Sequence, residues 1–280
     1  MDSLVSTEWL AGQLGAPDLR IVDASFFLPD EGRDARAEYE NGHIPGAVFM
    51  DLAEIADADH PVPAMLPPDY KFASRMQTLG IGDGDRIVVY DNTPHHSAAR
   101  AWWMLRTFGA TKAALLDGGL VKWKAEGRPL ASGPNEAKRS HFTDRLDPRK
   151  LADQAYVAGI IHSDGHELVD ARNANRFAGE MPEPRPGVTP GHIPCSKNLP
   201  QTMLFNPDNS WKRGEALRGA FEEAGVDLGK PMVTTCGGGV TAAVVLFGAH
   251  LLGKEDVKLY DGSWAEWGSD PSTPKATGRA

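Results

Sequence analysis

Cysteine is scarce in this sequence: a chain of 280 residues contains only Cys195 and Cys236. Two cysteines cannot form a disulfide framework like that of small secreted domains, and free thiols suit a reducing compartment. No segment approaches the roughly 18 consecutive apolar residues that a membrane-spanning helix needs. Residues 1–8 have neither a basic region nor an apolar core, so we expect no secretory signal. These absences predict a cytoplasmic protein that does not enter a membrane.

The sequence also lacks an excess of positive charge, because its formal net charge at pH 7 is −9. That balance argues against nucleic acid or an anionic membrane as a partner. Hydrophobic residues make up 41% of the chain and charged residues 24%, as in folded globular proteins. The length is sufficient for two domains of ordinary size.

The most informative segment is residues 233–242, Val-Thr-Thr-Cys-Gly-Gly-Gly-Val-Thr-Ala. The β-branched run that ends at Thr235 predicts a strand, and the apolar residues 241–252, closed by Gly253, predict a helix. Three glycines between them remove every side chain directly after Cys236. Successive N–H groups at such a turn can point inward, and the helix N-terminus adds partial positive charge. This environment favours the nucleophilic thiolate, so we predict a catalytic cysteine that holds an anion on its sulfur.

The loop is also compatible with three other patterns, to different degrees. Cys236 could be a small, inert core residue in a glycine-rich turn, and the loop alone leaves that alternative open. A dinucleotide-binding fingerprint is weakly matched by Gly237, Gly239 and Ala242, but only about 40 residues follow, too few for such a domain. The phosphatase-like pattern of cysteine, five residues and arginine fails, because Thr241 and Ala242 stand where the arginine would be.

An internal repeat divides the chain near its middle. Four short motifs recur in the same order at a nearly constant spacing. The pairs begin at Ile21 and Leu168, at Gly42 and Gly191, at Ile87 and Met232, and at Leu116 and Tyr260. Such ordered recurrence indicates a tandem duplication.

Each half alternates short apolar strands with amphipathic helical stretches, which predicts an α/β fold with a parallel sheet flanked by helices. The expected strands are residues 19–22, 87–90, 113–116, 167–169, 232–235 and 257–259, and a helix is expected over residues 98–108. The first domain is predicted to span residues 1–132, a polar linker 133–150, and the second domain 151–280. Residues 269–280 are expected to form a loosely held tail.

The duplicated Asp-Ala and Gly-His-Ile-Pro signatures, the Asp-Gly motifs followed by tryptophan, and the Cys-Gly-Gly-Gly-Val-Thr loop resemble those of two-domain rhodanese-type sulfurtransferases. The resemblance covers essentially the whole chain and implies tandem rhodanese-like domains. It implies that the second domain carries the catalytic Cys236, while the first is an inactive copy that walls one side of the active-site cleft. Asp91 stands in that copy where the cysteine would be, and an aspartate cannot carry a persulfide. His95 and His96 follow it without partners spaced to complete a metal site, so we expect no metal and no cofactor.

Three arginines of the second half are candidates to hold an anionic substrate, because a guanidinium fork suits carboxylates. They could equally be loop charges paired with Glu180 and Glu183. The resemblance implies that Arg176 and Arg185 bind substrate, the second being typical of the branch that uses 3-mercaptopyruvate. Arg172 directly follows a predicted strand and is expected to form a salt bridge between elements.

The uncharged loop also resembles the 3-mercaptopyruvate branch, since enzymes that use thiosulfate typically carry arginine and lysine after the cysteine. The sequence departs from that branch at three positions. Gly238, Ala53 and Ala64 stand where the branch usually has the serine, aspartate and histidine of a proposed proton relay. Thiosulfate therefore stays open as an alternative donor.

The resulting prediction is a sulfurtransferase with a ping-pong mechanism. Cys236 attacks the sulfur of a small anionic donor, 3-mercaptopyruvate in the first instance, and becomes a persulfide. The persulfide is expected to be stabilised by backbone amides of the loop, those of Gly237, Gly238, Gly239, Val240 and Thr241. A thioredoxin-like protein, a small thiol or cyanide then accepts the sulfur. The rival hypothesis from another class is a non-catalytic binding module, and the retained cysteine argues against it.

Cys195 replaces the glycine expected after the second Gly-His-Ile-Pro motif. We interpret it as a small residue in a turn, with a redox-sensing thiol as the alternative.

Overall fold

The computed structural model describes residues 1–28 and 31–279 of the chain. Two compact units are present. The first comprises Met1–Ala58, Leu66–Asp147 and Asn206–Trp211, and the second comprises Asp59–Met65, Pro148–Phe205 and Lys212–Ala280. Residues 133–147, expected to form most of a linker, group with the first unit. Hydrogen bonds explain this, since the Gly133 N–H donates to the Glu40 carbonyl and the Asn135 side chain donates to the Ala47 carbonyl.

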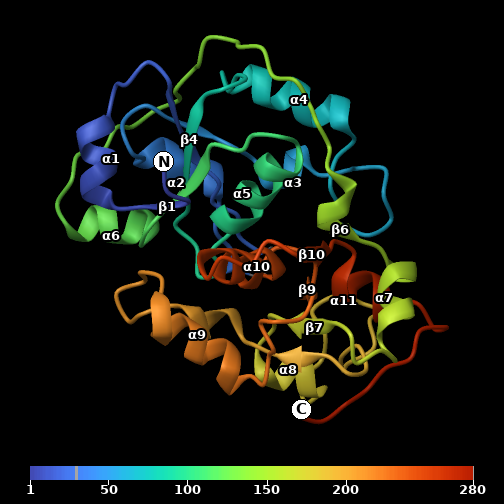
Figure 1. Cartoon of the computed structure of the whole chain (residues 1–280). Coiled ribbons are helices and arrows are strands. Elements are labelled where there is room, and N and C mark those ends of the chain that lie inside the picture. Colours follow the sequence, from blue (N-terminus) through green and yellow to red (C-terminus); the bar gives the residue numbers. More distant parts are fainter. Residues whose placement is uncertain (29–30, 280) are drawn as a thin grey trace. The chain divides into compact units, whose positions relative to one another are not determined.

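The first unit is built on a parallel sheet with the strand order β1-β5-β4-β2-β3. Its strands are β1 (Leu4–Val5), β2 (Leu19–Asp23), β3 (Ala47–Phe49), β4 (Arg86–Tyr90) and β5 (Ala113–Leu116). Its helices are α1 (Thr7–Gln13), α2 (Ala35–Asn41), α3 (Leu52–Ile55), α4 (Asp69–Thr78), α5 (Ala98–Thr107) and α6 (Gly119–Ala125). Figure 1 shows α1 and α6 together on one side of the strands and α4 and α5 on the other. Because helices cover both faces, the central strands are apolar without alternation, which matches the runs seen in the sequence.

The second unit repeats this topology with the order β6-β10-β9-β7-β8, again parallel. Its strands are β6 (Leu151–Ala152), β7 (Glu167–Asp170), β8 (Lys197–Asn198), β9 (Met232–Thr235) and β10 (Val257–Tyr260). Its helices are α7 (Gln154–Ile160), α8 (Ala174–Ala178), α9 (Gly214–Glu223), α10 (Ala242–Leu251) and α11 (Ser263–Trp267), with 3₁₀ turns η2 (Pro148–Lys150) and η3 (Gln201–Leu204). The identical strand order confirms the α/β fold class and the duplication.

The duplication extends to single side-chain contacts around the Gly-His-Ile-Pro motifs. In the first unit the ring of His43 stacks on Tyr39, with 4.1 Å between ring centres, and its Nδ1 lies 2.8 Å from the Tyr39 carbonyl oxygen. In the second unit His192 stacks on Phe177 at 3.8 Å, and its Nδ1 lies 2.8 Å from the Phe177 carbonyl oxygen. Each histidine therefore fastens its motif to the preceding helix, α2 or α8. These histidines are structural in both copies.

The expectation of a loosely held tail after residue 268 is wrong. Ala276 forms two backbone hydrogen bonds with His192, of 2.8 and 2.9 Å, in an antiparallel bridge. Farther along, the Gly278 N–H donates to the Ala178 carbonyl at 2.9 Å. Main-chain pairing with a loop that the hydrophobic pattern does not reveal holds this segment in place.

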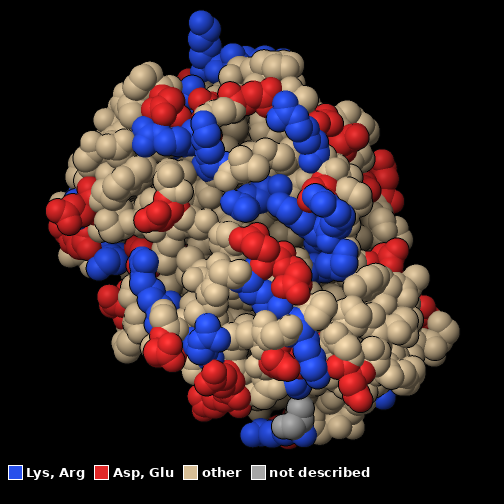
Figure 2. All heavy atoms as spheres, viewed as in Figure 1, with Lys and Arg blue, Asp and Glu red and all other residues tan. Residues whose placement is uncertain are grey.

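No helix in residues 1–28 or 31–279 combines the length and apolar character needed to cross a membrane. Acidic and basic side chains are interspersed over the face shown in Figure 2. Within the described part of the chain, no three His, Cys, Asp or Glu side chains gather as metal ligands.

Candidate active site

Cys236 lies directly after β9, which is paired with β10 on one side and β7 on the other. The chain passes through residues 236–241 and enters α10 at Ala242, so the predicted strand, loop and helix are all present. The helix ends before Gly253, whose φ of +84° provides the left-handed glycine stop that the sequence indicated. Carboxyl ends of parallel strands are where open α/β sheets place their ligand sites. The thiol sits at such an edge and is buried, with 2% of the residue exposed.

Backbone N–H groups at the start of α11 bind the carbonyl groups of the loop. Trp264 N–H donates to the Cys236 carbonyl and Ala265 N–H donates to the Gly237 carbonyl, each at 3.0 Å. The Cys236 N–H donates to the Ser263 hydroxyl at 3.2 Å. Among the described residues, no acceptor contacts the following amides of the loop, those of Gly237, Gly238, Val240 and Thr241. The loop is thus fixed by its carbonyls while these donors stay available to an anion.

A buried ionic network lies beside the loop. Arg172, whose side chain is 1% exposed, contacts Asp170 at 2.7 Å and Glu183 at 3.0 Å. Glu183 uses its second oxygen to contact Arg176 at 2.5 Å. The Arg172 guanidinium also lies over the Trp264 ring, 4.8 Å from its centre. Arg172 is therefore the inter-element salt-bridge residue that its position after the strand indicated.

Glu183 is the residue of this network that sequence reasoning missed. The sequence indicates only a surface partner for a loop arginine, yet the Glu183 side chain is 3% exposed and joins two arginines. Two flanking prolines, in the Pro-Glu-Pro-Arg run, were the available signal, because they fix the backbone on both sides of it. Glu180, the other acid considered, pairs with Arg279 at 3.0 Å instead.

Arg185 is half-buried and has no carboxylate within salt-bridge distance among the described residues. Burial lowers the pKa of its guanidinium, and repulsion from Arg176 adds to this, while attraction to Cys236 opposes it. The same sulfur attracts Arg172, whose pKa is lowered by burial but raised overall by Asp170, Glu183 and Cys236. Three guanidinium groups thus face two buried carboxylates, which leaves one positive charge uncompensated near the thiol.

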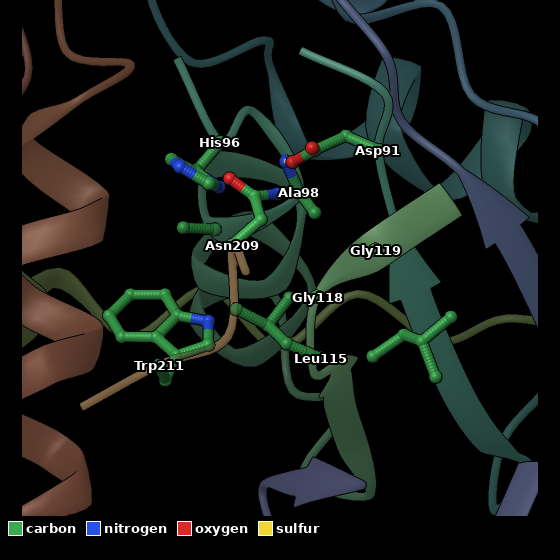
Figure 3. Close-up of a pocket in the computed structure, with 10 residues that line it drawn as sticks. Asp91, His96, Ala98, Leu115, Gly118, Gly119, Asn209 and Trp211 are labelled. Atoms are coloured by element: carbon green, nitrogen blue, oxygen red, sulfur yellow. The ribbon is translucent and has the colours of Figure 1, made fainter. Parts of the chain in front are cut away.

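The first unit has an aspartate at the position equivalent to Cys236. Asp91 follows β4, is buried, and accepts hydrogen bonds from Thr93 N–H at 3.3 Å and Ala98 N–H at 2.7 Å. Burial raises its pKa to about 7, against the effect of these two hydrogen bonds. Figure 3 shows Asp91 at a small pocket that is also lined by His96 and Trp211. The cavity of about 20 Å³ has room for roughly one water molecule, so it cannot hold a sulfur donor.

The other residues singled out in the sequence lie in turns or at a helix start. Cys195 is exposed and has a φ of +63°, in the left-handed region that Gly46 occupies in the first copy with a φ of +83°. Ala53 is the second residue of α3, where its N–H donates to the Asp51 side chain at 3.1 Å. Ala64 has a φ of +65°. Neither alanine side chain can carry a proton, so Ala53 and Ala64 cannot take part in the proton relay proposed for the related enzymes.

Comparison with known proteins identifies the fold. The profile of the rhodanese-like domain matches residues 6–126 and, a second time, residues 153–270. This chain belongs to the rhodanese family. The resemblance inferred from the motifs is confirmed, and the two matched ranges coincide with the two halves of the duplication.

Similarity extends over nearly the whole chain in several relatives. The 3-mercaptopyruvate sulfurtransferase of Homo sapiens is 44% identical over 271 residues, which cover 95% of this chain and 91% of that protein. The 3-mercaptopyruvate sulfurtransferase of Escherichia coli K12 is 41% identical, with 96% of both chains covered. A thiosulfate sulfurtransferase from Cricetulus griseus is also 41% identical and covers 95% of this chain and 91% of its own length.

Solved structures agree with the fold. SseA from Escherichia coli, described as a 3-mercaptopyruvate sulfotransferase with the rhodanese fold, superposes with a TM-score of 0.87 at 39% identity, covering 94% of this chain and 99% of SseA. Tum1 from Saccharomyces cerevisiae superposes with a TM-score of 0.90 at 29% identity, with 99% of both chains covered.

Proposed function

We propose that this protein is a sulfurtransferase that moves sulfur from 3-mercaptopyruvate to a thiol or to cyanide through a persulfide on Cys236. The observation that carries the proposal is the buried thiol at the edge of an amide-lined loop, beside a cluster with one uncompensated positive charge. The relatives named as 3-mercaptopyruvate sulfurtransferases support the choice of donor.

The loop amides are proposed to hold the charge on the sulfur, first as thiolate and then as persulfide. The first unit supports this role, because its equivalent loop binds the Asp91 carboxylate through two backbone N–H groups. In the second unit Cys236 takes that position, and among the described residues no carboxylate hydrogen-bonds to the amides of Gly237, Gly238, Val240 and Thr241. Donors fixed in advance by the fold stabilise developing charge without reorganisation, which is an effective catalytic arrangement.

Arg176 and Arg185 are proposed to bind the carboxylate of the donor. Arg176 uses part of its guanidinium to bind Glu183. Within residues 1–28 and 31–279, the one hydrogen bond of Arg185 is to the Gly237 carbonyl, at 3.4 Å, so both arginines retain donors for a substrate. The relatives named as 3-mercaptopyruvate sulfurtransferases support 3-mercaptopyruvate as the donor.

The proposed reaction has two half-reactions. The Cys236 thiolate attacks the sulfur of 3-mercaptopyruvate, a sulfur–sulfur bond forms, and the bond between carbon and sulfur breaks. The carbon keeps the electron pair of that bond and takes up the thiol proton. The product that leaves is pyruvate. An acceptor thiol then attacks the outer sulfur, takes it with the proton, and releases the Cys236 thiolate. Gly238, Ala53 and Ala64 cannot carry the proton, so it comes from solvent, from the donor itself or from another residue of the protein.

Thiosulfate is the second candidate donor, favoured by the 41% identity to a thiosulfate sulfurtransferase and by the lack of relay residues, since thiosulfate has no thiol proton to transfer. We propose that a small thiol or a thioredoxin-like protein is the acceptor and that the protein acts in the cytoplasm, where a reactive thiol stays reduced. A non-catalytic binding role is disfavoured, because a binding module has no need of a buried thiol beside unpaired amides.

A steady-state comparison of the two donors tests the proposal. We expect a higher kcat/KM with 3-mercaptopyruvate, and Arg176→Ala and Arg185→Ala should each lower it about 10- to 100-fold, as expected for losing a charge-assisted hydrogen bond of about 1.5–3 kcal/mol. A matched control is Arg279→Ala, which removes an exposed arginine of the same unit. Unchanged kinetics in both test variants would reduce these arginines to structural charges, and a preference for thiosulfate would replace the donor.

A further inference from the structure

Each half of the duplication contributes one loop to the unit formed mainly by the other half. Asp59–Met65, from the first half, groups with the second unit, and Asn206–Trp211, from the second half, groups with the first unit. Both loops occupy the same place in the repeat, between the short helical turn that follows an edge strand and the next long helix, α4 or α9. The loop before α4 is therefore part of the unit that contains Cys236.

Backbone geometry fixes the correspondence between the two loops residue by residue. Ala64 has a φ of +65° and Asn209 has a φ of +68°. Ala64 lies five residues before Asp69, the first residue of α4, and Asn209 lies five residues before Gly214, the first residue of α9. Residues other than glycine rarely adopt this left-handed conformation. Its recurrence at the same distance from equivalent helices identifies Ala64 as the counterpart of Asn209.

In the first unit, Asn209 helps to fill the pocket next to Asp91, which stands where the second unit has Cys236. Figure 3 shows the side-chain amide of Asn209 turned towards His96 and Ala98. These residues line the same cavity, whose volume is about 20 Å³, enough for roughly one water molecule. A side chain at this place in the loop therefore limits the space next to the residue that follows the central strand.

We propose that Ala64 is the corresponding wall residue of the Cys236 site, and that its small methyl group leaves room beside the thiol for sulfur donors bulkier than 3-mercaptopyruvate. Asparagine is larger than alanine by an amide group, so the space gained is about the size of that group. The backbone does not explain the alanine, because asparagine and glycine adopt a left-handed φ more readily. The inference rests on the proposed function and deepens it, since it adds a class of donor, anionic sulfane-sulfur compounds with a bulky substituent.

Thiosulfonates are donors of graded size that share one reactive group. The Cys236 thiolate attacks the outer sulfur, a sulfur–sulfur bond forms, and the bond to the sulfonyl sulfur breaks. The sulfonyl group keeps the electron pair and leaves as a sulfinate. The wild type should use both methanethiosulfonate and benzenethiosulfonate. Ala64→Asn should lower kcat/KM for benzenethiosulfonate about tenfold relative to that for methanethiosulfonate, as expected for a misfit in a pocket, and should leave kcat/KM for 3-mercaptopyruvate nearly unchanged.

Alkylation of Cys236 tests the wall independently of sulfur transfer. Rates with iodoacetamide and with the bulkier N-phenyliodoacetamide are followed by mass spectrometry of the Cys236 peptide, with the exposed Cys195 as a reference in each sample. Ala64→Asn should lower the ratio of the bulky to the small reagent about tenfold at Cys236 and should leave the ratio at Cys195 unchanged. Ala64→Gly keeps the space and should keep the ratio. Asn209→Ala, at the counterpart in the first unit, is the matched control and should change neither ratio.

Three results would overturn the proposal. One is an Ala64→Asn protein that keeps the wild-type ratios for both the donors and the alkylating reagents. Another is a wild type that reacts with methanethiosulfonate but not with benzenethiosulfonate. The third is an equal effect of Asn209→Ala and Ala64→Asn on the alkylation of Cys236. If the alkylation ratio shifts as described while no donor forms a persulfide, the proposed function falls and the assignment of Ala64 to the wall remains.

Discussion

The buried aspartate of the first unit should make that unit lose stability as pH rises. Asp91 has a folded-state pKa of about 7 because burial disfavours its charge, whereas an unfolded aspartate titrates near its ordinary value of 3.8. The folded chain therefore binds the proton more tightly. Stability from this group is fully present below pH 4 and is lost as the pH rises towards 7, after which it stays level.

The shift sets the size of the effect. The two pKa values differ by about 3 units, and each unit corresponds to about 1.4 kcal/mol, so the loss can reach about 4 kcal/mol. Asp91→Asn carries no charge at any pH, but its NH2 group replaces one of the two oxygens that accept from the Thr93 and Ala98 N–H groups. We therefore expect a fixed cost for the lost hydrogen bond at every pH, and a stability relative to the wild type that rises by about 4 kcal/mol between pH 4 and pH 8. Asp23, also buried with a raised pKa, adds a smaller repulsion that raises the pKa of Asp91, so its contribution to the comparison cancels in part.

Hydrogen exchange measured by mass spectrometry on peptides of β4 and α5 reports the first unit specifically. The exchange data, corrected for intrinsic exchange rates, give a free energy of opening for each peptide. Between pH 5 and pH 7 this free energy should fall in the wild type relative to Asp91→Asn by about 1.4 kcal/mol per pH unit. Asp2→Asn, at an exposed carboxylate of the same unit, serves as the control and should follow the wild type. Parallel profiles for the wild type and Asp91→Asn would refute the assignment of a raised pKa.

Three further predictions follow from the second unit and the relay positions. Cys195→Gly should raise the free energy of unfolding by about 1 kcal/mol in denaturant titrations, because it relieves a left-handed φ, and should leave sulfur transfer intact; lower stability would contradict this. Glu183→Gln should loosen Arg176 and raise the KM for 3-mercaptopyruvate more than that for thiosulfate, and equal effects on both donors would point to a merely structural role. Gly238→Ser alone should give no gain in turnover. Gly238→Ser combined with Ala53→Asp and Ala64→His should raise turnover with 3-mercaptopyruvate more than with thiosulfate. A triple variant that accelerates both donors equally would show that proton transfer does not limit turnover.

The central strands of both sheets could be predicted from the sequence because they are buried on both faces and therefore read as apolar runs. The runs ending at Tyr90 and Thr235 became β4 and β9, with boundaries within one residue of the prediction. The edge strands were missed, since β1, β6 and β8 have two residues each and β3 has three, too few to carry a periodicity. Their existence depends on pairing with distant segments, which a local pattern cannot show.

The candidate site was predictable where a single motif defines it, and not where it depends on contacts across loops. The position of Cys236 between strand and helix was readable from residues 233–242. The burial of Glu183 could not be read from the sequence, because a carboxylate in a proline-containing loop is usually exposed. Its two arginine partners offset the cost of removing the charge from water. The close approach of Arg185 to Gly238, from 53 residues earlier in the chain, was equally hidden, because it depends on how two loops meet.

The most direct test of the account is the mass of the Cys236 peptide. Purified protein incubated with 3-mercaptopyruvate and no acceptor should gain the mass of one sulfur atom on this peptide, and adding a thiol acceptor should remove it. Cys236→Ser should gain nothing and lose turnover, because a hydroxyl is a far weaker nucleophile at neutral pH. Sulfur found on Cys195 instead, or turnover retained by Cys236→Ser, would contradict the claim that Cys236 carries the transferred sulfur.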